Sequence, residues 1–159
     1  MTKGYTHRNL ILWNRAQQLA LDVMQIVQRL PNTWGNAVIA RQIVASATSI
    51  GANIAEGHGR YAPGAHRNHL AIAKGSTAET DSWLDLLRRA GYLSGEEEAR
   101  LHAECQEIAA MLTSKIRKLE NAIPSRGSTT HEEQVSYTTD DESSPPFPFT
   151  PEDYQSSAE

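Results

Sequence analysis

Several features that would place this 159-residue chain outside the cell or in a membrane are missing from its sequence. It has one cysteine, Cys105, which excludes an internal disulfide and favours a reducing cytoplasm. No run of about 18 apolar residues is present, as a membrane-spanning helix would require. The N-terminal segment MTKGYTHRNL lacks the apolar core of a signal peptide. We therefore expect a cytoplasmic protein with no membrane partner.

Basic residues are absent from the C-terminal segment. All 15 Lys and Arg lie within residues 1–126 beside 11 Asp and Glu, whereas residues 127–159 hold eight acids, so a body of +4 precedes a tail of −8. The tail is also rich in Ser, Thr and Pro, a composition that buries too little apolar surface to fold. We expect a folded domain over residues 1–123 and a disordered acidic tail over residues 124–159.

The body lacks β-hairpin and βαβ patterns and shows the apolar spacing of amphipathic helices instead. A first helix ends at Pro31, and a third begins near Pro63 and ends at Gly91. A fourth begins at Ser94, where Glu97 has the spacing of a capping box. The pattern predicts an all-α fold, an antiparallel up-and-down four-helix bundle with a disordered C-terminal tail. The predicted core positions are Leu12, Ala16, Leu19, Val23, Ile26 and Leu30; Ile43, Ala47, Ile50, Ile54 and Gly57; Leu70, Ala73, Thr77, Thr80, Leu84 and Leu87; and Leu101, Cys105, Ile108, Leu112 and Leu119.

A polar stripe runs beside the apolar one in the segment SIGANIAEGHGR. Asn53, Glu56 and Arg60 recur there at helical spacing, and Ser76 and Glu79 occupy a similar stripe on the next helix. A buried polar group without a partner costs about 1–3 kcal/mol, so we expect these five side chains to form a hydrogen-bonded network within or between subunits. The network either fixes helix register or binds a ligand. The first interpretation is favoured, because polar networks in bundles commonly specify packing.

The same segment carries a family resemblance. SIGANIAEGHGR, followed by LAIAKGSTAET and LRRAGYLSGEE, resembles the ordered motifs of the 23S rRNA intervening-sequence proteins, a four-helix-bundle family. The likeness covers about residues 10–120; Gly51 stands at a position where the family usually has proline, and Gly64-Ala65-His66 departs from a commoner acidic-aromatic stretch. The matching residues are Ser49, Ile50, Asn53, Ile54, Ala55, Glu56, Gly57, Gly59, Arg60, Ile72, Ala73, Gly75, Ser76 and Glu79.

The resemblance has consequences for assembly and partners. It implies a ring-shaped homo-oligomer, with a pentamer favoured, and it does not imply an enzyme. The family is similar to the accessory variability determinant of diversity-generating retroelements, a basic pentameric barrel that binds a reverse transcriptase and nucleic acid. A reverse transcriptase and RNA or DNA are therefore expected partners.

Up-and-down connectivity would gather basic residues at one end of the bundle. The start of the first helix, the connection over residues 59–66 and the end of the fourth helix share that end. Repeated around a ring, it would form a basic collar suited to phosphate backbones, and the alternative is ordinary solvated charge near helix ends. Few aromatic residues lie there, so we expect backbone contacts and little base stacking. The candidate nucleic-acid-binding residues are Lys3, Arg8, Arg15, Arg60, Arg67, Lys74, Lys115, Arg117 and Lys118.

Motifs of metal and nucleotide enzymes are missing. A di-iron bundle needs Glu-x-x-His pairs, but Glu98 and His102 are four residues apart. His66 and His69 lack the further ligands of a zinc site, and no P-loop or dinucleotide fingerprint occurs. We expect no enzyme, cofactor or metal. The sequence predicts a nucleic-acid-binding accessory protein; the alternative is a structural protein–protein interaction module with no nucleic-acid role.

Overall fold

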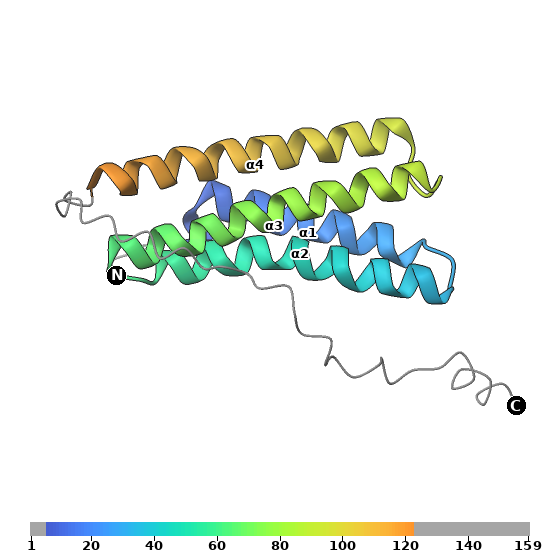
Figure 1. The fold of residues 1–159 in the computed structure, drawn as a ribbon, viewed down its shortest axis with the longest axis horizontal. Helices are drawn as coiled ribbons and strands as arrows, with labels where there is room; N and C mark the ends of the chain where they lie inside the picture. The colour runs from blue at the N-terminus through green and yellow to red at the C-terminus, as the bar shows by residue number, and fades with distance from the viewer. Residues whose placement is uncertain (1–5, 123–159) are drawn as a thin grey trace, which may run out of the picture. The chain divides into compact units, whose positions relative to one another are not determined.

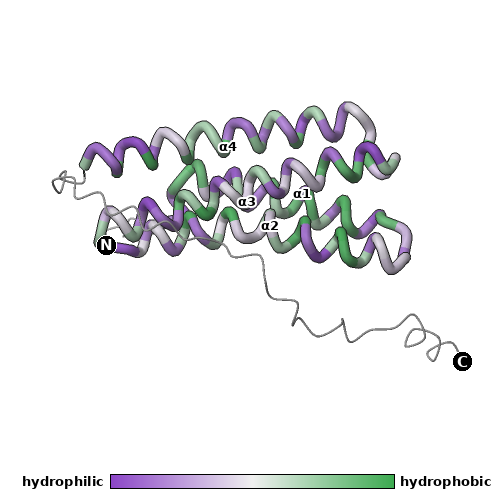
Figure 2. The backbone as a smooth tube through the Cα atoms, viewed as in Figure 1, coloured by the Kyte–Doolittle hydropathy of each residue, from purple (hydrophilic) through white to green (hydrophobic). Residues whose placement is uncertain are grey.

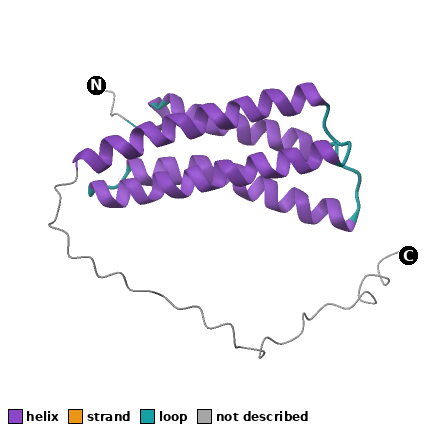
Figure 3. Ribbon diagram, turned by 45° about the horizontal axis from the view of Figure 1, so that its top comes forward, coloured by secondary structure: helices purple, strands orange, loops and turns teal. Residues whose placement is uncertain are grey.

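A computed structural model describes residues 6–122, which form an antiparallel four-helix bundle (Figure 1). These residues contain helices, turns and loops and no strand (Figure 3). The predicted all-α fold is therefore confirmed. The acidic tail and Lys3 lie outside the described residues, so the expectations for them remain predictions. The elements are a 3-10 turn, η1 (His7–Asn9), followed by α1 (Ile11–Gln28), α2 (Trp34–His58), α3 (Pro63–Arg89) and α4 (Gly95–Ala122).

Local signals set the ends of α3 and α4. Pro63 is the first residue of α3, where its missing N–H leaves no intrahelical bond unmade. After α3, Gly91 adopts a φ of +79°, a left-handed conformation that side chains disfavour. At the start of α4 the backbone N–H of Glu97 donates to Ser94 Oγ (3.1 Å), and the Ser94 N–H donates back to the Glu97 carboxylate (3.4 Å). The predicted capping box therefore forms.

The helix α2 is longer than its apolar pattern suggests. The first predicted core position is Ile43, but the helix begins at Trp34. The side chain of Thr33 caps it by accepting a hydrogen bond from the N–H of Asn36 (3.3 Å). Because the first turns of α2 contain few buried apolar residues, apolar spacing alone does not reveal them.

One core runs through the bundle. Figure 2 shows hydrophobic and hydrophilic stretches alternating along the helices, as expected when one side of each faces the core. The predicted core positions are buried except Leu30 and Leu119, which are partly buried and pack against the core. Thr77 and Thr80 are buried without a loss of hydrogen bonding, since each hydroxyl donates to the carbonyl one turn earlier in α3. None of the helices in the described part of the chain has the length and apolar character needed to cross a membrane.

Candidate nucleic-acid interface

One end of the bundle brings together the α2–α3 connection and the end of α4, and η1 lies in the same half of the bundle, set back from that end (Figure 1). We call this end the basic pole and define it by residues 6–10, 55–69 and 112–122. It holds six Arg and Lys against two carboxylates, Glu56 and Glu120. The excess positive charge makes it the region best suited to anions. Its basic residues are Arg8, Arg60, Arg67, Lys115, Arg117 and Lys118.

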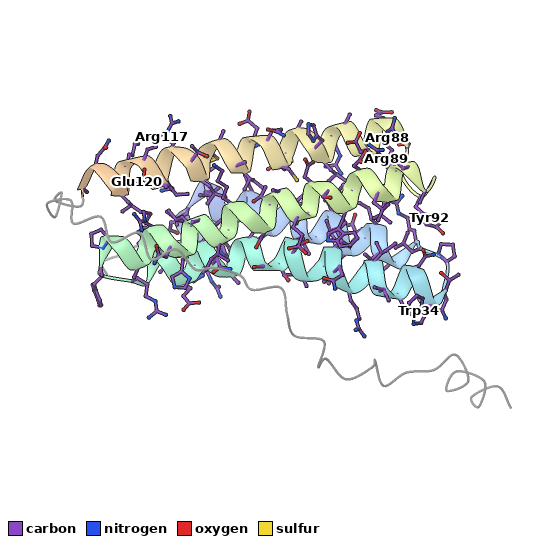
Figure 4. The ribbon with its side chains drawn as sticks, viewed as in Figure 1. Trp34, Arg88, Arg89, Tyr92, Arg117 and Glu120 are labelled. Carbon is purple, nitrogen blue, oxygen red and sulfur yellow. The ribbon has the colours of Figure 1, made fainter. Side chains whose placement is uncertain are left out.

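Most of these basic residues have no carboxylate partner among residues 6–122. Arg60 pairs with Glu56 one turn earlier in α2. Arg67 donates to the side-chain oxygen of Asn68 (3.2 Å) and forms no ion pair with the described residues. Arg117 is exposed on the outer side of α4 (Figure 4). Arg8 and Lys118 are likewise exposed, and neither they nor Arg117 and Lys115 pair with a described carboxylate.

Two residues that the sequence assigned to this pole contribute little to it. Arg15 makes two hydrogen bonds to the Glu104 carboxylate (2.7 and 2.8 Å) and lies 3.8 Å from Glu107. The hydrogen bond to Glu104 raises the pKa of Arg15, and the pairing neutralises its charge. Lys74 is exposed but lies eleven residues beyond the start of α3, about 16 Å along the helix. We therefore remove Arg15 from the candidate interface and place Lys74 outside the basic pole.

The opposite end of the bundle contains arginines that are mostly paired. Figure 4 places Arg88, Arg89, Tyr92 and Trp34 at the end remote from Arg117. Arg89 pairs with Asp85 (2.7 Å), and Arg88 lies 3.9 Å from Glu98. Two further pairs, Arg29 with Glu97 (2.9 Å) and Arg100 with Asp22 (2.8 Å), border a cavity of about 260 Å³ between α1 and α4.

A line of polar contacts runs between α2 and α3. The hydroxyls of Ser49 and Ser76 are 2.9 Å apart across the two helices. The Asn53 amide donates to the Ser49 carbonyl (2.9 Å) and hydroxyl (3.1 Å), which leaves its oxygen facing His69 Nδ1 at 3.2 Å. Since that oxygen can only accept, Nδ1 of His69 carries the proton. We call this line the polar seam; its members are Ser46, Ser49, Asn53, Glu56, Arg60, His69, Ser76 and Thr80.

The seam reaches the basic pole through His69. Its Nε2 lies 3.6 Å from the Glu56 carboxylate, which also accepts a hydrogen bond from Arg60. The hydrogen bond from Arg60, and the charge of His69 to a smaller extent, lower the pKa of Glu56. Asn53, Glu56, Arg60 and Ser76 are thus linked, whereas Glu79 accepts from Trp83 on its own helix (3.4 Å) and is not linked to the other four.

Ser49 and His69 were not among the residues predicted for the hydrogen-bonded network. A signal for both was present in the spacing: Ser49 lies one turn before Asn53, and His69 lies two turns before Ser76. Thr80 also joins, because its hydroxyl oxygen lies 3.0 Å from that of Ser46. Among the described residues every buried side-chain nitrogen or oxygen has a hydrogen-bond partner. The buried part of the seam therefore fits a role in packing.

Gly57 sets how closely α2 and α3 approach at the basic pole. A Cβ atom there would lie 3.0 Å from the Cβ of His69 and 3.1 Å from Cδ2 of His66. It would also lie 3.3 Å from the His66 carbonyl oxygen, which cannot move without moving α3. The close approach brings His66 beside His58. Burial, followed by the charges of His58, Lys115 and His69, lowers the pKa of His66.

The remaining titratable groups offer little reactive chemistry. Burial raises the pKa of the Cys105 thiol to about 12, so the thiolate nucleophile is scarce near neutral pH. His102 lies 2.8 Å from Asp81, and this hydrogen bond raises the pKa of His102. Within residues 6–122, no three His, Cys, Asp or Glu side chains are grouped as metal ligands.

The fold and its charged end define a small all-α protein whose exposed groups are suited to binding. Residues 8–114 match the family described as 23S rRNA-intervening sequence protein, and the chain belongs to this family. A similar solved structure is a protein of unknown function from the S23 ribosomal protein family of Bacteroides thetaiotaomicron VPI-5482. The two chains share 31% identity with a TM-score of 0.63, over 67% of this chain and 99% of the other. No curated protein matches the chain.

Proposed function

We propose that this protein is a non-enzymatic, oligomeric accessory protein that binds the phosphate backbone of RNA or DNA through its basic pole. The observation that carries the proposal is the group of cations there, the exposed Arg8, Arg117 and Lys118 and the partly exposed Arg67, which no described carboxylate neutralises. Such charges bind phosphates with little dependence on sequence. Reactive groups of an enzyme are not needed for this role.

Exposed apolar side chains support assembly into a ring. On α3, Ile72 is 52% exposed and Leu86 is 40% exposed; on α1, Leu21 is 52% exposed and Met24 is 44% exposed. The helix α2 packs between α1 and α3, so these two groups form different patches on the two sides of α2. Contact between unlike patches is head-to-tail, and it closes into a ring when the rotation permits. A homo-oligomer would repeat the basic pole around such a ring, and the family resemblance favours a pentamer.

The family supplies the biological setting of the proposal. Its name links it to intervening sequences of 23S rRNA. The resemblance stated from the sequence to the accessory variability determinant suggests a reverse transcriptase as a protein partner. The role proposed for this chain is to hold an RNA or DNA strand beside such a partner.

A second candidate function is a protein–protein interaction module. It is favoured by the end opposite the basic pole, where Trp34 is 69% exposed and Tyr92 is 38% exposed. Aromatic side chains of this kind are enriched in protein interfaces. In this alternative the exposed cations of the basic pole would be solvated charge only.

Binding of a mixed-sequence RNA by the full chain over a series of salt concentrations separates the two functions. Backbone binding predicts that log affinity falls linearly with log salt, by about 0.7 per single-strand phosphate contact. The double variant Arg117→Glu, Lys118→Glu should lower both the affinity and this slope. The matched control Arg88→Glu, Arg89→Glu reverses the same amount of charge at the opposite end and should change neither. Equal losses in the two variants, or no salt-dependent binding by the unmodified protein, would contradict the proposal.

Light scattering on the full chain tests the assembly. A homo-oligomer is expected at micromolar concentration, and Ile72→Glu should shift it toward monomers because a charge would enter the apolar contact. A monomer in the unmodified protein would refute the ring.

A further inference from the structure

One aromatic side chain of the basic pole is fully exposed. Tyr61 lies in the connection between α2 and α3 at the end of the bundle (Figure 1), and it is 104% exposed, against 69% for Trp34 at the opposite end. It is the single Phe, Tyr or Trp residue in the ranges that define the basic pole. Isolated exposed aromatic residues are common on protein surfaces. The position of Tyr61 among cations therefore carries more information than its exposure alone.

The backbone on both sides of Tyr61 is tied to the helix ends. The connection has only residues 59–62, because α3 begins at Pro63. Before Tyr61, the N–H of Gly59 donates to two carbonyls in the last turn of α2 (3.0 and 3.2 Å). After it, Ala62 has an extended backbone (φ −77°, ψ 123°), the conformation that a following proline favours. A ligand that contacts the ring therefore has little backbone to order, which lowers the entropic cost of binding.

Cations flank this ring along the chain and on the neighbouring helix. Arg60 precedes Tyr61 directly, and its side chain is 51% exposed although it pairs with Glu56. Arg67 follows in the second turn of α3, and the end of α4 adds the exposed Arg117 and Lys118 at the same pole. Sites for single-stranded nucleic acids combine these two elements: cations attract the backbone, and an aromatic ring stacks on a base. The basic pole therefore has both.

We propose that Tyr61 stacks on an unpaired nucleobase, so that the basic pole binds single-stranded nucleic acid in preference to a duplex. Every base has a flat face, so this contact does not require a particular sequence. The bases of a duplex are paired and stacked on one another, and none is available to Tyr61. Phosphate contacts alone would not give this preference, because a duplex carries more charge per unit length than a single strand.

This inference rests on the proposed function and adds the class of nucleic acid to it. The small number of aromatic residues at the basic pole led us to expect little base stacking from the sequence. One ring is nevertheless enough for one base, and the structure shows that the ring of Tyr61 is accessible. Stacking on one base is worth about 1–3 kcal/mol, which corresponds to about 5- to 150-fold in affinity.

Fluorescence anisotropy tests the inference on the full chain with a labelled mixed-sequence RNA, as a single strand and as a duplex of the same length. Tyr61→Ala should weaken binding of the single strand by about 5- to 150-fold and leave binding of the duplex unchanged. The slope of log affinity against log salt should stay the same, because stacking releases no counterions. Tyr61→Phe keeps the ring and should bind like the unmodified protein. The matched control Trp34→Ala removes an exposed ring at the opposite end and should change neither affinity (Figure 4).

The outcomes separate this inference from the proposed function. Salt-dependent RNA binding that Tyr61→Ala leaves unchanged, or weakens equally for strand and duplex, would overturn the stacking contact and keep the proposed function. A loss of single-strand binding in Tyr61→Phe would also overturn it, since the ring is retained there. No RNA binding by the unmodified protein would refute both. If Tyr61→Ala fails to fold by circular dichroism, Tyr61→Gln, which also lacks the ring, decides by the same criteria.

Discussion

The two ends of the bundle carry similar numbers of basic side chains but differ in how many of them pair with a carboxylate. At the end opposite the basic pole, four of the five arginines lie against a carboxylate: Arg29, Arg88, Arg89 and Arg100. At the basic pole only Arg60 pairs with a carboxylate that the structure describes. Ion pairs on a surface add little stability, so the difference is better explained by what each end presents to solvent. Paired charge is unavailable to a ligand, whereas unpaired charge attracts one.

The basic pole also contains a close approach of α2 and α3 at Gly57, and Gly57→Ala should disturb it with the largest effect. The added Cβ would lie 3.0 Å from the Cβ of His69 and 3.3 Å from the backbone oxygen of His66, so α3 must shift by a few tenths of an ångström. We expect the free energy of unfolding to fall by about 2–3 kcal/mol. The matched control is Gly75→Ala in the interior of α3, where a Cβ meets nothing within 4 Å. It should raise stability by about 0.5–1 kcal/mol, and urea denaturation measures both.

The next largest effect should come from the polar seam. Asn53→Ala removes the donor to Ser49 and the acceptor of His69, and it should destabilise the protein by about 1–2 kcal/mol. Glu56→Ala should have a smaller effect, because the Glu56 side chain is half exposed and water replaces its partners. Thermal denaturation of the two variants sharpens the comparison between the buried and exposed parts of one network. Equal losses would show that the seam acts as a single unit.

Acidification should affect the two ends in opposite directions. His66 has a lowered pKa in the folded state, so its contribution to stability is complete above about pH 6.5 and is lost as pH falls through 6.5 toward the folded value. His102 has a raised pKa, so its contribution is complete below about pH 6.5 and is lost as pH rises through the folded value. Denaturation between about pH 8 and about pH 5 should show that His66→Gln reduces the loss of stability in acid and that His102→Gln increases it. If stability changed with pH in the same way in both variants, the opposite pKa shifts given to His66 and His102 would be wrong.

The smallest expected effect concerns the acidic tail, which begins after the end of α4 at the basic pole. The sequence predicts a disordered tail, and a disordered segment of about 30 residues would have a root-mean-square reach near 30 Å. On this prediction its eight acids would compete with RNA for the basic pole. Truncation after Arg126 should raise RNA affinity, most strongly at low salt where screening is weakest. Filter binding of the full and truncated chains at two salt concentrations measures the gain. Equal affinity at low salt would leave the tail as a solubilising segment.

Much of the fold was predictable because its signals are local. The proline at position 63, the glycine at 91 and the capping box at Ser94 act within one helical turn. Apolar spacing identified the core, since residues three and four apart share one side of a helix. Apolar spacing did not predict the start of α2, because that start depends on a cap at Thr33 and not on apolar residues.

The candidate site was less predictable because it depends on pairs that are distant in sequence. Arg15 and Glu104 are 89 residues apart, and the local sequence around either residue does not predict their ion pair. Glu79 has the helical position of a seam residue, but its hydrogen bond goes to Trp83 on the same helix. Helical spacing gives the side of a helix on which a residue lies; it does not give the partner that faces it.

The sequence by itself determined the four helices, most of their ends, the core positions and the family of this protein, because periodicity, caps and ordered motifs are properties of neighbouring residues. The tertiary structure decided which charges remain unpaired. It neutralised Arg15, left Arg117 exposed and placed the partly buried His66 where burial lowers its pKa. The physical reason is that electrostatic interactions depend on distance in space, and only the packed helices set those distances.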